Sequence, residues 1–167
     1  MRTFLDSNIL LAAYNAREPE SEAALAIMLE GHREFVGSDY LKLELYPFAV
    51  RANDPDQVEF FDRYFAALVQ LVETSPVLVG NALTLAGRYG LGAGDALLAR
   101  AAMDAAAREF VTKEAPTKPL CSIAPEELRV RTLFRQRPRS RLHVYWSWVK
   151  AKGDRLVSRL SSDHPRR

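Results

Sequence analysis

Short apolar runs that alternate with helical patterns are the feature that most constrains the fold of this chain. Residues 3–5, 35–37 and 110–112 are brief, apolar and bounded by polar or turn residues, as buried strands are. Longer segments with apolar side chains at helical spacing separate these runs. Strands that alternate with helices predict a three-layer α/β/α fold with a central, mostly parallel sheet. At 167 residues, the chain is long enough for one domain with a substantial core.

The helical segments are bounded by recognisable caps and breakers. Ser38 is a good N-cap, Gly90 ends a helical pattern, and Pro47 lies inside one, where it could kink the helix. We expect helices over residues 8–14, from about 18 to 31, 38–48, 57–71, 82–89 and 95–108. Residues 76–79 fit either a strand or a helix start, and residues 119–123 are a further candidate strand.

Four acids occupy conspicuous places in this pattern: Asp6, Glu44, Asp95 and Glu114. Asp6 and Glu114 each follow an apolar run, and Asp95 follows Gly92-Ala93-Gly94 at the start of an alanine-rich helix. Carboxylates at the ends of parallel strands can converge although they are distant in sequence. Converging carboxylates repel one another and need a cation, and hard oxygen ligands suit Mg²⁺ or Mn²⁺.

Each acid also has an ordinary structural interpretation. Asp6 and Asp95 could cap helices, and Glu114 could be a loop acid. Glu44 could be solvated, although its spacing from Leu41 turns it toward the core, where an unpaired Glu is rare. The combination of the four, rather than any one of them, predicts a site.

Several other catalytic classes lack their motifs. The sequence has no GxxxxGK[ST] phosphate loop, no GxSxG elbow and no HExxH zinc motif. Asn8 stands where an aspartyl-phosphate phosphatase would need a second Asp. Cys121 is the single cysteine, which excludes an internal disulfide framework and fits a reducing, cytoplasmic location. Asp6 interrupts the first apolar run, so we expect no signal peptide, and no apolar stretch is long enough for a membrane span.

These motifs together resemble the PIN-domain nucleases, which in bacteria include the VapC-type toxin ribonucleases. The resemblance covers roughly residues 1–125. It is carried by Leu5-Asp6-Ser7-Asn8-Ile9-Leu10-Leu11, Glu44, Leu91-Gly92-Ala93-Gly94-Asp95-Ala96-Leu97-Leu98-Ala99 and Phe110-Val111-Thr112-Lys113-Glu114. The chain departs from the family at Glu114, where the last motif usually has Asp.

The resemblance implies metal-dependent hydrolysis of phosphodiester bonds in RNA. Asp6, Glu44, Asp95 and Glu114 would be the catalytic residues and hold Mg²⁺ or Mn²⁺, while Ser7, Asn8 and Thr112 would orient a carboxylate or a phosphate. It also implies RNA as a partner, and a toxin role would add a cognate antitoxin protein. We further expect a homodimer.

Two other functions stay open at this stage. A non-catalytic RNA-binding module on the same fold is the first, and metal-dependent RNA cleavage would distinguish it from a nuclease. A small phosphatase or receiver-like domain is the second, but it needs a Lys partner, and the surroundings of Lys113 do not match that motif.

The charge of the chain is strongly asymmetric. Residues 1–128 carry 11 Lys+Arg and 19 Asp+Glu, whereas residues 129–167 carry 12 and 2. We therefore expect a PIN-like domain over residues 1–128 and a basic C-terminal helical extension over residues 129–167. The arginines of that extension are candidate nucleic-acid contacts: Arg135, Arg137, Arg139 and Arg141. A solvated tail, or a helix whose apolar face packs on protein, is the alternative.

Overall fold

A parallel sheet of five strands is the centre of the computed structural model, which describes residues 1–16 and 20–134. The strands are β1 (Arg2–Leu5), β2 (Glu34–Ser38), β3 (Gln70–Val72), β4 (Glu109–Thr112) and β5 (Arg129–Thr132). The helices are α1 (Ser7–Asn15), α2 (Ser21–Met28), α3 (Asp39–Arg51), α4 (Pro55–Ala66), α5 (Pro76–Tyr89), α6 (Ala93–Asp104) and the 3₁₀-helix η1 (Pro119–Ser122).

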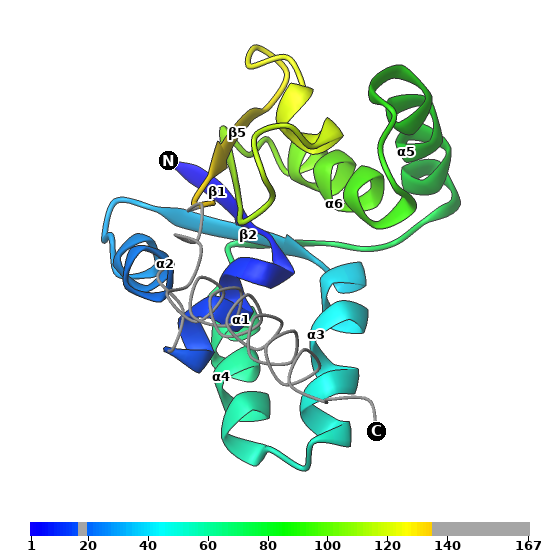
Figure 1. Ribbon diagram of the computed structural model, residues 1–167. Helices are drawn as coiled ribbons and strands as arrows, with labels where there is room; N and C mark the ends of the chain where they lie inside the picture. Colours follow the sequence, from blue (N-terminus) through cyan, green and yellow to red (C-terminus); the bar gives the residue numbers. More distant parts are fainter. Residues whose placement is uncertain (17–19, 135–167) are drawn as a thin grey trace, which may run out of the picture. The chain divides into compact units, whose positions relative to one another are not determined.

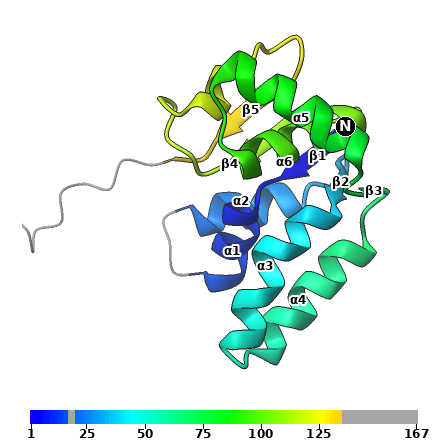
Figure 2. The same cartoon turned by 90° about the vertical axis from the view of Figure 1, so that its right-hand side faces the viewer.

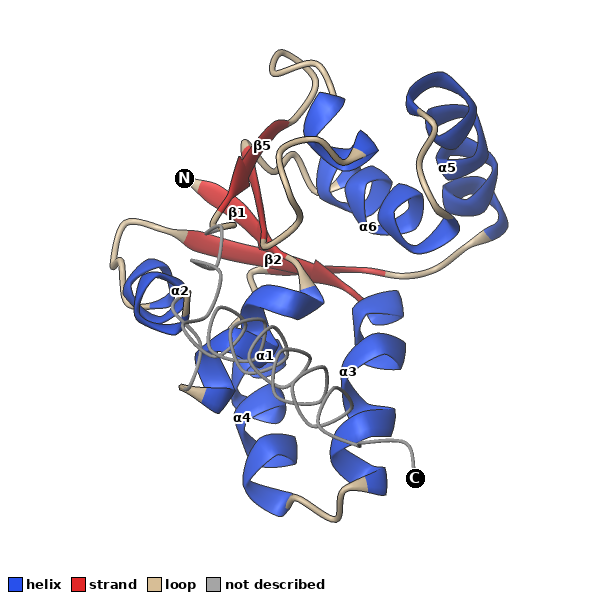
Figure 3. Ribbon diagram, in the orientation of Figure 1, coloured by secondary structure: helices blue, strands red, loops and turns tan. Residues whose placement is uncertain are grey.

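The helices cover both faces of this sheet. In two perpendicular views, α1 to α4 lie on one side of the strands, and α5 and α6 lie on the other (Figures 1 and 2). The same three-layer arrangement is visible when strands and helices are coloured separately (Figure 3). The predicted three-layer α/β/α fold with a parallel sheet is therefore confirmed.

The strand order is β3-β2-β1-β4-β5. β2 and β3 are added on one side of β1, and β4 and β5 on the other, so the order of the strands reverses between β1 and β4. β1 pairs with β2 on one side and with β4 on the other, in the register Phe4 to Phe110. The rings of these two residues stack with centroids 5.2 Å apart. Open parallel sheets bind ligands at the carboxyl ends of the strands, where the order reverses.

Local sequence signals account for most helix boundaries. The Ser38 hydroxyl accepts a hydrogen bond from the Leu41 N–H, as an N-cap does. Gly90 ends α5 with φ of 69°, a left-handed conformation that glycine adopts without steric cost. Ser75 caps the start of α5, and Pro76 follows it, so residues 76–79 begin a helix rather than a strand.

The structure differs from the sequence expectation at several boundaries. α4 ends at Ala66 and is followed by β3, although residues 57–71 were expected to be one helix. Residues 119–122 form a 3₁₀-helix instead of a strand. β5 lies in the sheet beside β4, so the sheet extends past residue 128, where the sequence suggested a domain boundary. Only Val130 is apolar in β5, which is why its pattern gave no strand signal.

Small side chains on α6 bring this helix close to the sheet. Its inward positions are buried alanines and one leucine: Ala96, Leu98, Ala99, Ala101 and Ala102. Close approach of α6 places its first turn near the carboxyl ends of the strands. No described helix is long and apolar enough to cross a membrane.

Candidate active site at the carboxyl edge of the sheet

Asp6 is the buried centre of the candidate site. It follows β1 directly and its exposed fraction is 6%. Asp6 occupies the N-cap position of α1, but its side chain makes no capping hydrogen bond. Its Oδ2 instead accepts from the Thr112 hydroxyl at 2.6 Å and from the Asn8 amide at 2.7 Å. The capping interpretation therefore does not explain this carboxylate.

Thr112 and Asn8 connect the start of α1 to the end of β4. The Thr112 hydroxyl accepts from the Asn8 amide and from the Glu114 N–H, both at 3.1 Å. The side-chain oxygen of Asn8, Oδ1, accepts from the Lys113 N–H at 2.8 Å. Ser7 donates to the other oxygen of Asp6, Oδ1, at 3.3 Å. All three of these uncharged side chains thus donate hydrogen bonds to the Asp6 carboxylate.

Burial and neighbouring acids disfavour the charged form of Asp6. Burial raises its pKa most, the hydrogen bond from Thr112 lowers it, and the charges of Glu44 and Asp95 raise it further. Together they raise the pKa of Asp6 from 3.8 to about 6. A carboxylate in this environment is stabilised by a cation.

Glu44 approaches the site from α3. This half-buried side chain lies against the first turn of α6, where its Oε1 is 3.1 Å from the position that a Cβ on Gly94 would take. A side chain at position 94 would therefore require the Glu44 carboxylate to shift by a few tenths of an ångström. Gly94, in the first turn of α6, thus leaves room for Glu44 beside Asp95.

Asp95 lies one residue beyond this contact, in the first turn of α6. The helix begins at Ala93 with Gly92 as its N-cap, so Asp95 is inside the helix and does not open it. Burial and the charge of Glu114 raise the pKa of Asp95, and the ammonium of Lys118 lowers it. An acid near a helix N-terminus is also favoured by the helix dipole.

Glu114 completes the group from the loop after β4. Its N–H donates to Thr112, and its carbonyl accepts from the Thr132 hydroxyl at 2.5 Å. Its charge, with that of Asp95, adds to burial in raising the pKa of the Cys121 thiol. Lys118 and Cys121 are therefore neighbours of the site that the sequence motifs did not indicate.

The four predicted acids thus share one region, linked in the pairs Asp6–Glu44, Asp6–Asp95 and Asp95–Glu114 by mutual repulsion. Their hard oxygen donors suit Mg²⁺ or Mn²⁺. Within the described ranges, however, no three His, Cys, Asp or Glu side chains are arranged so that they could hold a metal ion. Mg²⁺ is commonly bound by one or two carboxylates together with water, and the four acids can supply these. The predicted RNA contacts Arg135, Arg137, Arg139 and Arg141 lie outside the described residues.

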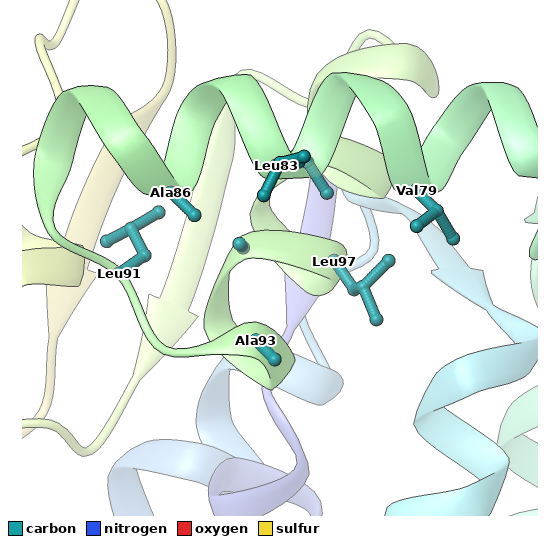
Figure 4. Close-up of a pocket in the computed structure, with 8 residues that line it drawn as sticks. Val79, Leu83, Ala86, Leu91, Ala93 and Leu97 are labelled. Atoms are coloured by element: carbon teal, nitrogen blue, oxygen red, sulfur yellow. The ribbon is translucent and has the colours of Figure 1, made fainter.

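A separate apolar pocket lies between α5 and α6, with a volume of about 310 Å³ (Figure 4). Its lining contains no titratable group: Val79, Ala82, Leu83, Ala86, Leu91, Ala93, Ala96 and Leu97. This pocket cannot perform acid–base or metal chemistry, so the acids at the edge of the sheet remain the candidate active site.

Solved structures with the same fold include several toxin–antitoxin proteins. A toxin–antitoxin complex from Klebsiella pneumoniae matches with a TM-score of 0.60 and 19% identity, over 80% of this chain and 99% of that chain. VapBC2 from Rickettsia felis, bound to a promoter DNA fragment, matches with a TM-score of 0.59 and 19% identity, over 79% and 98%. VapC20 from Mycobacterium tuberculosis, a sarcin-ricin loop cleaving toxin, matches with a TM-score of 0.55 and 14% identity, over 65% and 86%.

At these identities the likeness shows a shared fold. No curated protein sequence matches this chain significantly. The sequence model of the PIN domain matches residues 3–115, a range that contains all four acids. The chain therefore belongs to the PIN domain family.

Proposed function

We propose that this protein is a Mg²⁺- or Mn²⁺-dependent endoribonuclease that hydrolyses phosphodiester bonds in RNA. The observation that carries the proposal is the buried Asp6 carboxylate, held by Thr112 and Asn8 at the reversal point of the sheet and repelled by Glu44 and Asp95. Membership of the PIN domain family supports a nuclease. A buried acid whose charge is opposed by its own neighbours is typical of a cation-dependent site.

Each residue of the site has a role in this proposal. Asp6 and Asp95 would hold the metal, with Glu44 and Glu114 as further ligands or as groups that orient water. Ser7, Asn8 and Thr112 keep the Asp6 carboxylate in place. When bound, the metal ion supplies an activated water and offsets negative charge on the phosphate. The pKa of Asp6, near 6, leaves its carboxylate mostly ionised and able to bind a cation at neutral pH.

We also propose that the protein is the toxin of a toxin–antitoxin pair. The similarity in fold to the complexes from Klebsiella pneumoniae and Rickettsia felis supports this role. Exposed apolar side chains on α3, including Leu43, Phe48 and Val50, support a protein partner, either an antitoxin or a second copy in a homodimer. The reducing, cytoplasmic location inferred from Cys121 belongs to the same proposal. The toxin role can be tested at the neighbouring genes. We expect an adjacent short gene to encode a DNA-binding protein, and we expect that protein to co-purify with this chain.

A non-catalytic RNA-binding module is the second candidate function. It is favoured by one observation: among the described residues, no three His, Cys, Asp or Glu side chains are grouped so that they could hold a metal ion. RNA binding without cleavage in Mg²⁺ or Mn²⁺ would support the module over the nuclease.

Replacement of Asp95 by Asn tests the nuclease directly. We expect Asp95→Asn to reduce metal-dependent cleavage of single-stranded RNA by on the order of 10²-fold or more. The metal-free variant should melt at a temperature equal to or above that of the wild type, because a repelled acid is neutralised.

The matched control is Asp104→Asn, on the same helix, where the acid pairs with Arg100 at the surface. This control should keep wild-type cleavage. Full activity of Asp95→Asn would remove Asp95 from the mechanism, and an inactive wild type would contradict the nuclease itself.

A further inference from the structure

Tyr40 is an aromatic residue beside the acids that neither the motifs nor the proposed mechanism uses. It lies on α3 one helical turn before Glu44, so the two side chains share a face of the helix. Both approach Gly94: the Tyr40 hydroxyl is 3.5 Å, and the Glu44 Oε1 3.1 Å, from the position that a Cβ on Gly94 would take. The Tyr40 hydroxyl is therefore a neighbour of Glu44 and of the α6 turn that contains Asp95.

The hydroxyl of Tyr40 has an unused hydrogen-bonding capacity. Among the described residues it neither donates nor accepts a hydrogen bond. Among the described residues, the Tyr64 hydroxyl is the one buried side-chain group without a hydrogen-bond partner. The Tyr40 hydroxyl has no partner in this part of the chain either, so it is not fully buried. The Tyr40 oxygen thus reaches solvent, while its half-buried ring packs against the core.

A neutral donor is well suited to this position. A phosphate that approaches the acids meets several negative charges, and a cationic side chain next to Glu44 would form an ion pair with that acid. A tyrosine hydroxyl can donate a hydrogen bond to a phosphate oxygen and has no charge for Glu44 to neutralise. Its ring is held by packing, so the donor is already positioned before the substrate binds.

We propose that Tyr40 is a substrate-binding residue whose hydroxyl donates a hydrogen bond to a phosphate oxygen of the RNA strand next to the acidic site. The inference rests on the proposed nuclease function and adds a residue to it. Tyr40 would hold the backbone beside Glu44 and Asp95, so that the phosphodiester enters the site against the repulsion of the acids. The contact is made in the ground state and in the transition state alike.

Tyr40→Phe tests the proposal, because it removes the hydroxyl and keeps the ring. The substrate is a single-stranded RNA oligonucleotide that the wild type cleaves in Mn²⁺. We expect kcat/KM to fall by on the order of tenfold, mainly through a higher KM, as for removal of a hydrogen bond to a charged group. The melting temperature should not change, because the hydroxyl has no partner among residues 1–16 and 20–134.

Tyr46→Phe is the matched control on the same helix. The Tyr46 hydroxyl donates to Asp62 at 2.6 Å, and Asp62 is not one of the four acids of the site. Removal of this hydroxyl should therefore leave kcat/KM unchanged. An unchanged kcat/KM for Tyr40→Phe would overturn the proposal, and so would a decrease confined to kcat, which would place Tyr40 behind Glu44 rather than on the substrate. A wild type without metal-dependent cleavage would instead contradict the nuclease function, which separates the two failures.

Discussion

The Asp6 carboxylate is buried among groups that both favour and oppose its charge. Thr112 and Asn8 donate hydrogen bonds to it, yet burial and two neighbouring acids outweigh them and raise its pKa to about 6. In the metal-free protein, ionised Asp6 therefore destabilises the fold. The same arrangement favours a bound cation, because a cation offsets the repulsion that raises the pKa.

This raised pKa predicts a pH dependence of stability. Between pH 3.8, the ordinary value, and pH 6 the folded state binds more protons than the unfolded state, so Asp6 lowers the free energy of unfolding as pH rises through this window. Asp6→Asn should therefore stabilise the metal-free protein at pH 7.5 by up to about 3 kcal/mol, and much less near pH 4. Urea unfolding in a chelator at both pH values measures the difference. The same gain at both pH values would show that Asp6 is not the titrating group.

Glu114 is the residue at which the chain departs from the usual family motif, and its backbone is held at both its N–H and its carbonyl. Because the backbone is fixed, Glu114→Asp should move only the carboxylate and should keep or raise cleavage activity. Glu114→Gln should reduce activity less than Asp6→Asn does. Asp6 is the buried centre of the site, whereas Glu114 lies on the loop after β4, where its charge affects Asp95. Rates of RNA cleavage in Mn²⁺ rank the variants. A folded but inactive Glu114→Asp would show that the site requires the longer side chain.

Sequence motifs could indicate the four acids because their types and punctuation are local signals. Tyr40 and Lys118 carry no such signal, since their relation to the site depends on how α3, α6 and the loop after β4 meet. The contact of Glu44 with Gly94 is a similar case. Glu44 and Gly94 belong to helices that are far apart in the sequence, and the apolar spacing within each helix does not show which other helix it approaches.

At the scale of elements, a cluster of ion pairs connects strands at the amino-terminal ends of the sheet, opposite the carboxyl ends where the site lies. Arg33 and Glu109 pair at 2.6 Å with exposed fractions of only 4% and 5%. Arg33 also contacts Glu30 at 2.7 Å and the Thr3 hydroxyl at 2.8 Å. The cluster thus connects the segment before β2 to β1 and β4, the two strands that position Asp6 and Thr112.

Breaking this buried pair should destabilise the protein strongly. Glu109→Gln leaves the Arg33 charge buried with one acid fewer, which should lower the free energy of unfolding by about 3 kcal/mol. Glu59→Gln is the control, because Glu59 pairs with Arg63 on an exposed helix face, and its change should be within about 0.5 kcal/mol. Urea unfolding of the two variants compares them. Equal effects would mean that the buried pair adds nothing beyond a surface pair.

The helices were more predictable than the edge strands for a physical reason. Ser38, Gly90 and Pro76 act locally on the backbone, so they mark helix boundaries in the sequence itself. β3 and β5 lie at the edges of the sheet and are specified by pairing with β2 and β4. β5 has one apolar residue, and the Leu71 of β3 continues the apolar spacing of the helix before it, so neither short strand has a sequence signal of its own.

For the whole molecule, the charge asymmetry is the property that the fold does not explain. Residues 129–167 carry a balance of +10 and residues 1–128 a balance of −8. An acidic domain that binds RNA needs positive charge from a metal or from elsewhere in the chain. The basic C-terminal sequence is therefore the proposed source of phosphate contacts.

Deletion of residues 138–167 tests this source. If the segment binds RNA, the deletion should weaken RNA binding and reduce the slope of log K against log salt by about 0.7 for each phosphate that the shortened protein no longer neutralises. Fluorescence titration of single-stranded RNA over a range of salt concentrations measures the slope. An unchanged slope together with altered stability or oligomeric state would assign the segment a structural role.

The place of β1 in the sheet has a consequence for how the protein is made. Phe4 pairs with Phe110, so one of the two neighbours of the central strand is translated much later than the strand itself. A nascent or prematurely terminated chain that stops between α6 and β4 contains Asp6, Glu44 and Asp95 but lacks Thr112 and Glu114. In such a product β1 has β2 as its one neighbour and its other edge is left open, which favours proteolysis and aggregation. The site that we propose to cleave RNA is therefore completed only after β4 has been translated and has paired with β1.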